Sequence, residues 1–185
     1  MFHEIEDIEL ERSRLAHRPA PEEAPPVLSA FDVRTNCPVA EFDARLRSVL
    51  APALQLAVSH SFDEGELPVD TLPGWFVAAS QGASFETAPE HVRRGVERYA
   101  VAIGEGPWRP QEWLYQFDPE SEFRGWAWLD LTRSGDREAR IWVDTWGESF
   151  FACNELRWAA YVSGADEVSG PTLVRTADWL AAIES

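Results

Sequence analysis

Residues 125–149, GWAWLDLTRSGDREARIWVDTWGES, constrain the fold more than any other part of the chain. This segment holds four of the nine tryptophans and reads as a β-hairpin around a three-residue loop, Ser134-Gly135-Asp136. That register aligns opposite charges and like side chains across the strands, in the pairs Asp130–Arg140, Leu129–Ile141 and Trp128–Trp142. A slip of one residue would place charges among leucines, so the pattern specifies this alignment.

The hairpin in this register has two unequal faces. One is aliphatic and is expected to face the core, with Ala127, Leu129, Leu131, Ile141 and Val143. The other mixes indole rings with charged groups: Trp126, Trp128, Asp130, Arg140, Trp142, Asp144 and Trp146. Tryptophan and arginine are favoured anchors of protein interfaces, so this face predicts a partner-binding surface. The alternative is a face covered by the N-terminal segment or a helix, because tryptophan is usually mostly buried.

The composition indicates a soluble globular protein with a large excess of acid. The chain has 185 residues, 45% of them hydrophobic, which suits a single domain. A net charge of −16 repels phosphate backbones and anionic lipid, so we expect no nucleic acid and no membrane as partner. The same charge attracts cationic proteins, although acidity also serves solubility alone.

The sequence carries no sign of export. No apolar run approaches the roughly 20 residues that cross a bilayer, and the acidic N-terminus lacks the features of a secretory signal. Cys37 and Cys153 are therefore expected as two reduced thiols in a cytoplasmic protein.

Three segments are predicted along the chain. Residues 1–18 form an amphipathic N-terminal helical arm with a thin apolar stripe that includes Phe2. Residues 19–26 form a Pro-rich linker. Residues 27–185 form one α+β domain, in which a central antiparallel β-meander of three to five strands is flanked by helices.

Periodicity and capping residues place the elements of that domain. Strands are predicted over 27–35 and 112–118, the latter with Trp113, Tyr115 and Phe117 on one face. Helices are predicted over 39–58 with a kink at Pro52, over 87–103 with Thr87 as N-cap, over 149–164 closed by Gly164, and from Thr176 onward. The segment 75–80 fits either a buried strand or a helical turn.

We find no set of residues that predicts catalysis. Phosphate loops and the GxSxG, HExxH and CxxC motifs are absent from the sequence. His60 lies near Asp63, Glu64 and Glu66, but one imidazole in an acidic loop favours a solvated turn over a metal site. Asp118, Glu120 and Glu122 offer paired carboxylates for glycoside chemistry, yet they crowd one turn of ordinary loop composition. His91 is expected to be exposed, and Cys153 to be a buried, inert thiol.

We therefore predict a protein that is not an enzyme and that needs no cofactor and no metal. The two acidic groups, Asp63, Glu64 and Glu66 with Asp118, Glu120 and Glu122, become candidates for a surface that attracts a cationic partner. A solvated face is the alternative reading of such a charge run.

The order of features from about residue 67 to 162 resembles the SUKH superfamily of bacterial immunity proteins. The matching pieces are Leu72-Pro73-Gly74-Trp75-Phe76, the strands expected within 112–146, and the helix expected in ESFFACNELRWAAYV. The helix-ending Asn-Gly of that family is at best Gln81-Gly82 here. The resemblance implies an α+β fold that binds and neutralises a toxin without chemistry of its own.

Two functions follow as hypotheses. The first is an acidic, non-catalytic module that binds a basic protein, most plausibly a toxin domain, as immunity proteins do. The second is a small-ligand or carbohydrate binder that uses Trp126, Trp128 and Trp142 as a stacking platform, with Asp130 and Asp144 as polar clamps. The sequence leaves the partner, the oligomeric state and the exposure of each tryptophan open.

Overall fold

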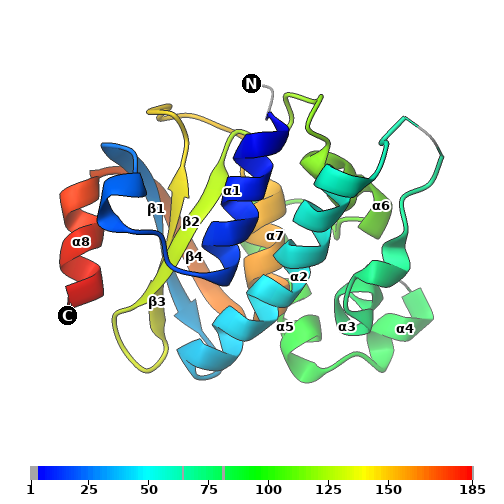
Figure 1. Ribbon diagram of the computed structural model, residues 1–185. Helices are drawn as coiled ribbons and strands as arrows, with labels where there is room; N and C mark the ends of the chain where they lie inside the picture. Colours follow the sequence, from blue (N-terminus) through cyan, green and yellow to red (C-terminus); the bar gives the residue numbers. More distant parts are fainter. Residues whose placement is uncertain (1–3, 64, 81, 185) are drawn as a thin grey trace.

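An antiparallel sheet lies at the centre of the computed structural model, which describes residues 4–63, 65–80 and 82–184 (Figure 1). Its strands are β1 Val27–Thr35, β2 Ala127–Arg133, β3 Glu138–Asp144 and β4 Ala165–Arg175. The helices are α1 Ile5–Ala16, α2 Val39–Ser59, α3 Gly74–Ala78, α4 Gly82–Glu86, α5 Glu90–Ile103, α6 Pro110–Leu114, α7 Asn154–Ser163 and α8 Thr176–Glu184. The predicted α+β class, with a central sheet flanked by helices, is confirmed.

The strand order is β2-β3-β1-β4, so β2 and β3 are the one neighbouring pair that is also consecutive in sequence. The meander is therefore limited to the predicted hairpin. The sequence analysis predicts no strand at the position of β4, because Gly170-Pro171 interrupts the sequence pattern there. The structure accommodates these two residues in a register shift opposite β1, between the partners of Ala30 and Asp32.

The hairpin forms, but the predicted register is wrong. Its connection is four residues long, 134–137, and the backbone N–H groups of Ser134 and Gly135 both donate to Glu138 O, at 2.9 and 3.0 Å. Leu131 therefore lies opposite Ile141 rather than Ala139. A second irregularity, between Trp128 and Asp130, shifts the register again toward the end of the hairpin that is distant from the turn.

These two shifts divide the hairpin tryptophans between the two faces of the sheet. Trp126 and Trp128 join Leu131, Ile141 and Val143 in the main core, on the side of α1, α2 and α7. Trp142 packs on the opposite face in a smaller cluster, with Leu28, Ala30, Leu129 and Trp179 of α8. Figure 1 shows α8 on one side of the sheet and the other helices on the opposite side. The predicted separation into one aliphatic and one indole face is therefore wrong.

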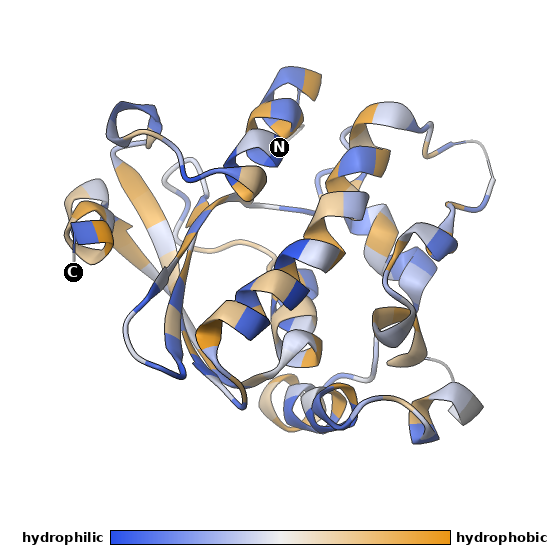
Figure 2. Cartoon of the chain, turned by 60° about the horizontal axis from the view of Figure 1, so that its bottom comes forward, coloured by the Kyte–Doolittle hydropathy of each residue, from blue (hydrophilic) through white to orange (hydrophobic). Residues whose placement is uncertain are grey.

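The hydrophobic pattern explains why both faces must be covered. Six consecutive residues of β2, from Ala127 to Thr132, are buried. Figure 2 shows hydrophobic residues along the strands and hydrophilic residues in the hairpin loop. Both faces of the strand are therefore covered, and on the second face the indoles of Trp179 and Trp142 donate to Asp130 and Thr132.

The N-terminal segment is docked on the domain. α1 lies against α2 and β2, burying Ile8 and Leu15 in the main core. Glu11, 1% exposed, forms an ion pair with Arg124, 2% exposed, at 2.7 Å. Residues 19–26 are also held, because the backbone N–H of Thr176 donates to Pro26 O at 3.2 Å. Phe2, part of the predicted apolar stripe, lies outside the described residues.

Most other sequence predictions hold, with one clear exception. β1, α2 (which continues through Pro52), α7 with Gly164 at its C-cap, and α8 all form. The strand predicted over 112–118 is helical instead, as α6 followed by a 3₁₀ turn, Tyr115–Phe117. Pro110 starts this helix, and it brings Trp113 and Phe117 together at a ring separation of 4.8 Å. Residues 75–80 are mostly helical, and α5 begins after Pro89 rather than at Thr87.

Candidate functional site

The predicted tryptophan platform does not reach the surface. Trp126, Trp128 and Trp142 are each 0% exposed. Trp142 Nε1 donates to Thr132 Oγ1 at 2.8 Å, and Trp126 Nε1 donates to the carboxylate of Glu155. These rings are core residues, so the stacking platform for a carbohydrate is excluded.

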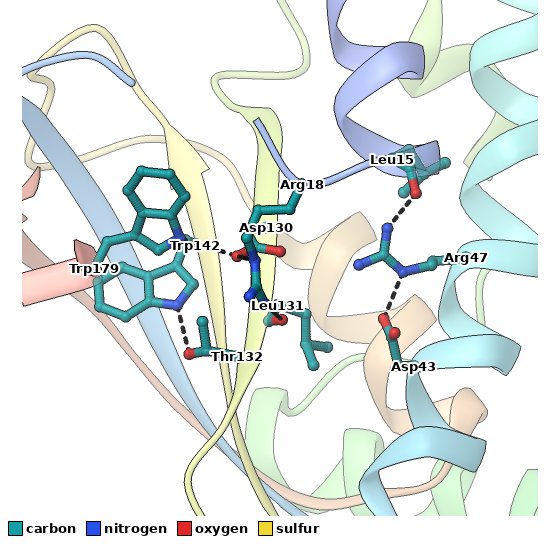
Figure 3. Close-up of polar contacts among 9 residues, drawn as sticks. All are labelled: Leu15, Arg18, Asp43, Arg47, Asp130, Leu131, Thr132, Trp142 and Trp179. Carbon is teal, nitrogen blue, oxygen red and sulfur yellow. Dashed lines mark hydrogen bonds and ion pairs between the residues drawn. The ribbon is translucent and has the colours of Figure 1, made fainter. Parts of the chain in front are cut away.

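The predicted pair Asp130–Arg140 is also wrong, because the observed register places Trp142 opposite Asp130. Asp130 is 2% exposed, and its Oδ2 accepts from Arg18 Nε at 2.7 Å and from Trp179 Nε1 at 3.0 Å (Figure 3). Arg140 pairs instead with Asp32 of β1, at 2.7 Å. Asp130 therefore joins the N-terminal segment to α8 and is not part of an open site.

An arginine of α2, Arg47, also connects α1 to α2. Arg47 donates to Leu15 O and to Asp43 Oδ1, the latter at 2.7 Å (Figure 3). Burial is the main reason that the pKa of Asp43 lies above its ordinary value, and the Arg47 charge opposes this shift. These contacts hold the N-terminal helix against α2.

Exposed aromatic side chains gather at one end of the hairpin. Phe123 is 58% exposed, Trp146 is 40% exposed and Phe150 is 94% exposed. Phe123 precedes β2, whereas Trp146 and Phe150 follow β3, and Ala127 and Asp144 are paired at this end. The two flanking segments lie side by side, since a Cβ added to Gly125 would come within 2.8 Å of Phe151 Cβ. We call Phe123, Trp146 and Phe150, together with the exposed carboxylates Glu120, Glu122 and Glu148, the hairpin-end surface.

Trp146 is presented by an unusual backbone. Its φ is 52°, in the left-handed region that a bulky residue rarely adopts, and Gly147 follows with φ 82°. The backbone N–H of Trp146 donates to Asp144 Oδ1 at 2.9 Å, and Glu148 N donates to Thr145 O at 2.9 Å, which closes a turn. Burial raises the pKa of Asp144, and the hydrogen bond from Trp146 opposes that rise. Strain of this kind is concentrated at functional sites.

The predicted acidic residues fall into two separate groups. Asp118 is half-buried and accepts from Glu120 N at 2.9 Å, which shapes the turn that carries Glu120 and Glu122 to the hairpin-end surface. Asp63 and Glu66 are exposed on the loop after α2, which Tyr115 Oη ties down through a hydrogen bond to Gly65 O at 3.0 Å. Glu64 lies outside the described residues.

A groove of about 970 Å³ adjoins the hairpin-end surface and shares Phe150 with it. Its walls come from the segment after α5 and from the start of α7, and they include Glu105, Trp108, Asn154 and Glu155. Sequence reasoning missed these residues, because segments about 50 residues apart meet here and neither carries a motif. The nearby sequence GEGPW, residues 104–108, lacks the spacing and the lysine of a phosphate loop, so it gives no positive indication of a site.

The cysteines and histidines form no reactive centre in the described part of the chain. Cys37 and Cys153 are buried and not bridged, and burial raises the pKa of the Cys153 thiol, as expected of an inert one. His91 is half-buried rather than exposed, with its ring 5.5 Å from that of Trp75. Burial lowers the pKa of His91.

Residues 4–63, 65–80 and 82–184 form neither a metal-binding cluster nor a membrane-spanning helix. Within these ranges, no three histidine, cysteine, aspartate or glutamate side chains are grouped so that they could hold a metal ion. Over the same residues, no helix has the length and apolar character needed to cross a membrane.

Comparison of the chain with models of protein families, with characterised proteins and with solved structures finds no match. The resemblance to the SUKH superfamily therefore stays a prediction. The hairpin-end surface and the adjoining groove are the regions on which a functional argument can rest.

Proposed function

We propose that this protein is a non-catalytic, acidic binding module that docks a basic protein partner through the hairpin-end surface, in the manner of an immunity protein that antagonises a toxin. The observation that carries the proposal is the set of exposed aromatic rings among carboxylates. Phe150 is 94% exposed, and contiguous exposed aromatics of this kind mark interaction sites.

The two kinds of side chain have different roles in such a contact. Carboxylates on a chain of net charge −16 raise the encounter rate with a cationic protein, by up to about 10³-fold at low salt. The rings supply the binding free energy, because a buried aromatic anchor contributes about 2 kcal/mol or more when it is a hot spot. The strained turn at Trp146 holds one ring in place before binding, which reduces the entropic cost.

The resemblance to SUKH immunity proteins supports the same class of function. The order of α7 after the hairpin of β2 and β3 is compatible with that resemblance. A basic toxin domain in the bacterial cytoplasm is the partner that fits both the resemblance and the charge. The alternative of a carbohydrate stacked on Trp126, Trp128 and Trp142 is not proposed again, because these rings are enclosed.

The test is neutralisation of a defined toxin. The chain would be co-expressed in bacteria with the basic toxin domain encoded beside its own gene, and growth and binding by calorimetry would be measured. We expect rescue of growth by the natural chain and its loss in Phe123→Ser and Phe150→Ser. Leu10→Ser is the control, since Leu10 is 42% exposed on α1 and lies outside the surface. Absence of binding, or equal binding by all three variants, would contradict the proposal.

A further inference from the structure

The groove beside the hairpin-end surface contains a fixed carboxylate. Trp108 Nε1 donates to Tyr99 Oη at 2.9 Å, and Tyr99 Oη donates to Glu105 Oε2 at 3.3 Å. Asn154 Nδ2 lies 3.4 Å from both oxygens of Glu105. These contacts join the end of α5 to the start of α7. Glu105 is therefore held in one place although it is exposed.

Tyr99 acts as a stable donor in this arrangement. It is fully buried, and burial is the largest cause that raises its pKa to about 12. Its hydroxyl proton therefore stays in place across the physiological range and points to the carboxylate of Glu105. A carboxylate positioned in this way is prepared to receive a cation, since little side-chain entropy remains to be lost.

A second carboxyl group lines the groove. Glu155 is 1% exposed, and Trp126 Nε1 is the one side-chain donor that the described residues give it. Its own backbone N–H also donates to the carboxyl group, and burial raises the pKa of Glu155, which disfavours its charged form. Glu105 is therefore the carboxyl group of the groove that can receive a cation.

Glu105 is the exposed carboxylate among the described lining residues of the groove. Arg157 is the basic residue among its described lining residues, and it donates to Val168 O at 3.2 Å and to Gly170 O. Its amino groups are therefore committed to the backbone of β4. Arg157 keeps its positive charge but directs its donors to β4, so a cationic ligand finds its complementary charge at Glu105.

The walls determine which cation fits. Trp108, Phe150 and Phe151 line the groove together with the carboxyl groups. Aromatic faces attract cations, and a planar guanidinium both stacks on such rings and binds a carboxylate through two parallel hydrogen bonds. An ammonium group cannot make this two-point contact. The combination of flat walls and a fixed carboxylate therefore favours arginine.

We infer that the groove binds the side chain of one arginine presented by the basic partner, with Glu105 receiving its guanidinium between Trp108 and Phe150. This inference rests on the proposed function and deepens it, because Phe150 belongs both to the hairpin-end surface and to the groove. The partner's arginine then lies beside the aromatic contact rather than at its rim.

The experiment uses a small probe in place of the partner. N-acetyl-arginine N-methylamide and the corresponding citrulline compound, which is nearly isosteric and uncharged, would be titrated into the ¹⁵N-labelled full chain. The Nε1–H signal of Trp108 and the side-chain amide of Asn154 report on the groove. We expect a saturable shift with the arginine probe and binding at least about tenfold weaker with citrulline, which corresponds to about 1.4 kcal/mol.

Matched variants test the role of Glu105. Glu105→Gln is expected to weaken binding of the arginine probe about tenfold, whereas Glu97→Gln, an exposed position of α5 outside the groove, should leave it unchanged within about twofold. Equal binding of the two probes, equal effects of the two variants, or no shift at Trp108 would overturn the inference.

The outcomes separate this inference from the proposed function. Loss of toxin binding in Phe123→Ser without any response to the arginine probe would overturn the inference alone, because Phe123 does not line the groove. A specific response to the probe without binding of any basic toxin would overturn the proposed function, and with it the partner as the source of the arginine.

Discussion

The buried pair of Glu11 and Arg124 should carry much of the attachment of α1. Arg124 Nη1 donates to both carboxylate oxygens of Glu11, at 2.7 and 2.9 Å. Glu11 Oε1 also accepts the backbone N–H of Trp128 at 2.7 Å, beside the register shift of β2. The substitution Glu11→Gln keeps the shape of the side chain but removes the negative charge, so the buried guanidinium of Arg124 loses its ion pair with Glu11.

The loss in the free energy of unfolding depends on the contacts that Arg124 keeps in the variant. Removal of one partner of a buried ion pair costs about 3–5 kcal/mol. The guanidinium carbon of Arg124 lies 4.9 Å from the ring centroid of Phe117 and 5.1 Å from that of Trp126, and these contacts persist in the variant. We therefore expect the lower end, a loss of about 3 kcal/mol in the free energy of unfolding. For a chain of this size, that corresponds to a Tm lower by about 6–12 °C.

Urea unfolding followed by tryptophan fluorescence and by far-ultraviolet circular dichroism measures this loss. Glu9→Gln on the same helix is the matched control, because Glu9 is exposed, and its effect should stay within about 0.5 kcal/mol. A loss below about 1 kcal/mol in Glu11→Gln would refute the reasoning, since it would mean that the pair does not hold α1 to the domain. Separate transitions by the two probes would show instead that α1 detaches alone.

Three further variants test the core and its titration. Gly95→Ala should destabilise the fold by about 3 kcal/mol or more, because its Cβ would lie 2.1 Å from Tyr161 O where α5 crosses α7; Gly106→Ala, which meets open space, is the control. Trp128→Ala should lower the free energy of unfolding by about 3–5 kcal/mol and leave fluorescence titrations with sugars silent in both proteins; a saturable shift in the natural chain would contradict this. Burial raises the pKa of Glu155 from its ordinary value of 4.5, so its protonated form stabilises the fold below that pH and the contribution is lost as pH rises through the folded pKa. Glu155→Gln should therefore gain stability relative to the natural chain as the pH rises above 4.5 in urea unfolding, and a difference independent of pH would contradict the assignment.

The elements predicted correctly are those with an uninterrupted period. α2 has a continuous apolar side, and Gly164 ends α7 with a φ of 121°, a conformation that suits glycine. The residues over 112–118 alternate as a strand would, yet Pro110 begins a helix there, and the ring contact of Trp113 with Phe117 has helical spacing. Local alternation over seven residues could not decide between the two.

The predicted register is wrong because the hairpin has apolar residues on both faces. With Trp128 and Leu129 both buried, a one-residue slip exchanges one apolar side chain for another, so the pattern does not penalise it. The sequence also cannot indicate α8 as the cover of the second face, since Trp179 lies far from the hairpin in sequence. The expectation that indoles beside charges are wet was wrong for this reason: Asp130 is satisfied by Arg18 and Trp179 rather than by solvent.

The sequence predicts the types of side chain at the candidate site but not the full set of residues that form it. Trp146 and the carboxylates after Asp118 were named from the sequence and are near the exposed end of the hairpin. Phe150, by contrast, falls inside the helix expected over 149–164, but α7 begins at Asn154 and leaves this ring exposed. Its exposure depends on where a helix starts, and capping patterns define such boundaries only within a few residues.

The left-handed backbone of Trp146 has a practical consequence for protein engineering. Glycine adopts that conformation without strain, so a search for thermostable variants should select Trp146→Gly early. The same replacement deletes an indole from the hairpin-end surface. If the proposed contact exists, heat resistance and partner affinity would move in opposite directions at this one position, and a screen for stability alone would remove a ring of the hairpin-end surface.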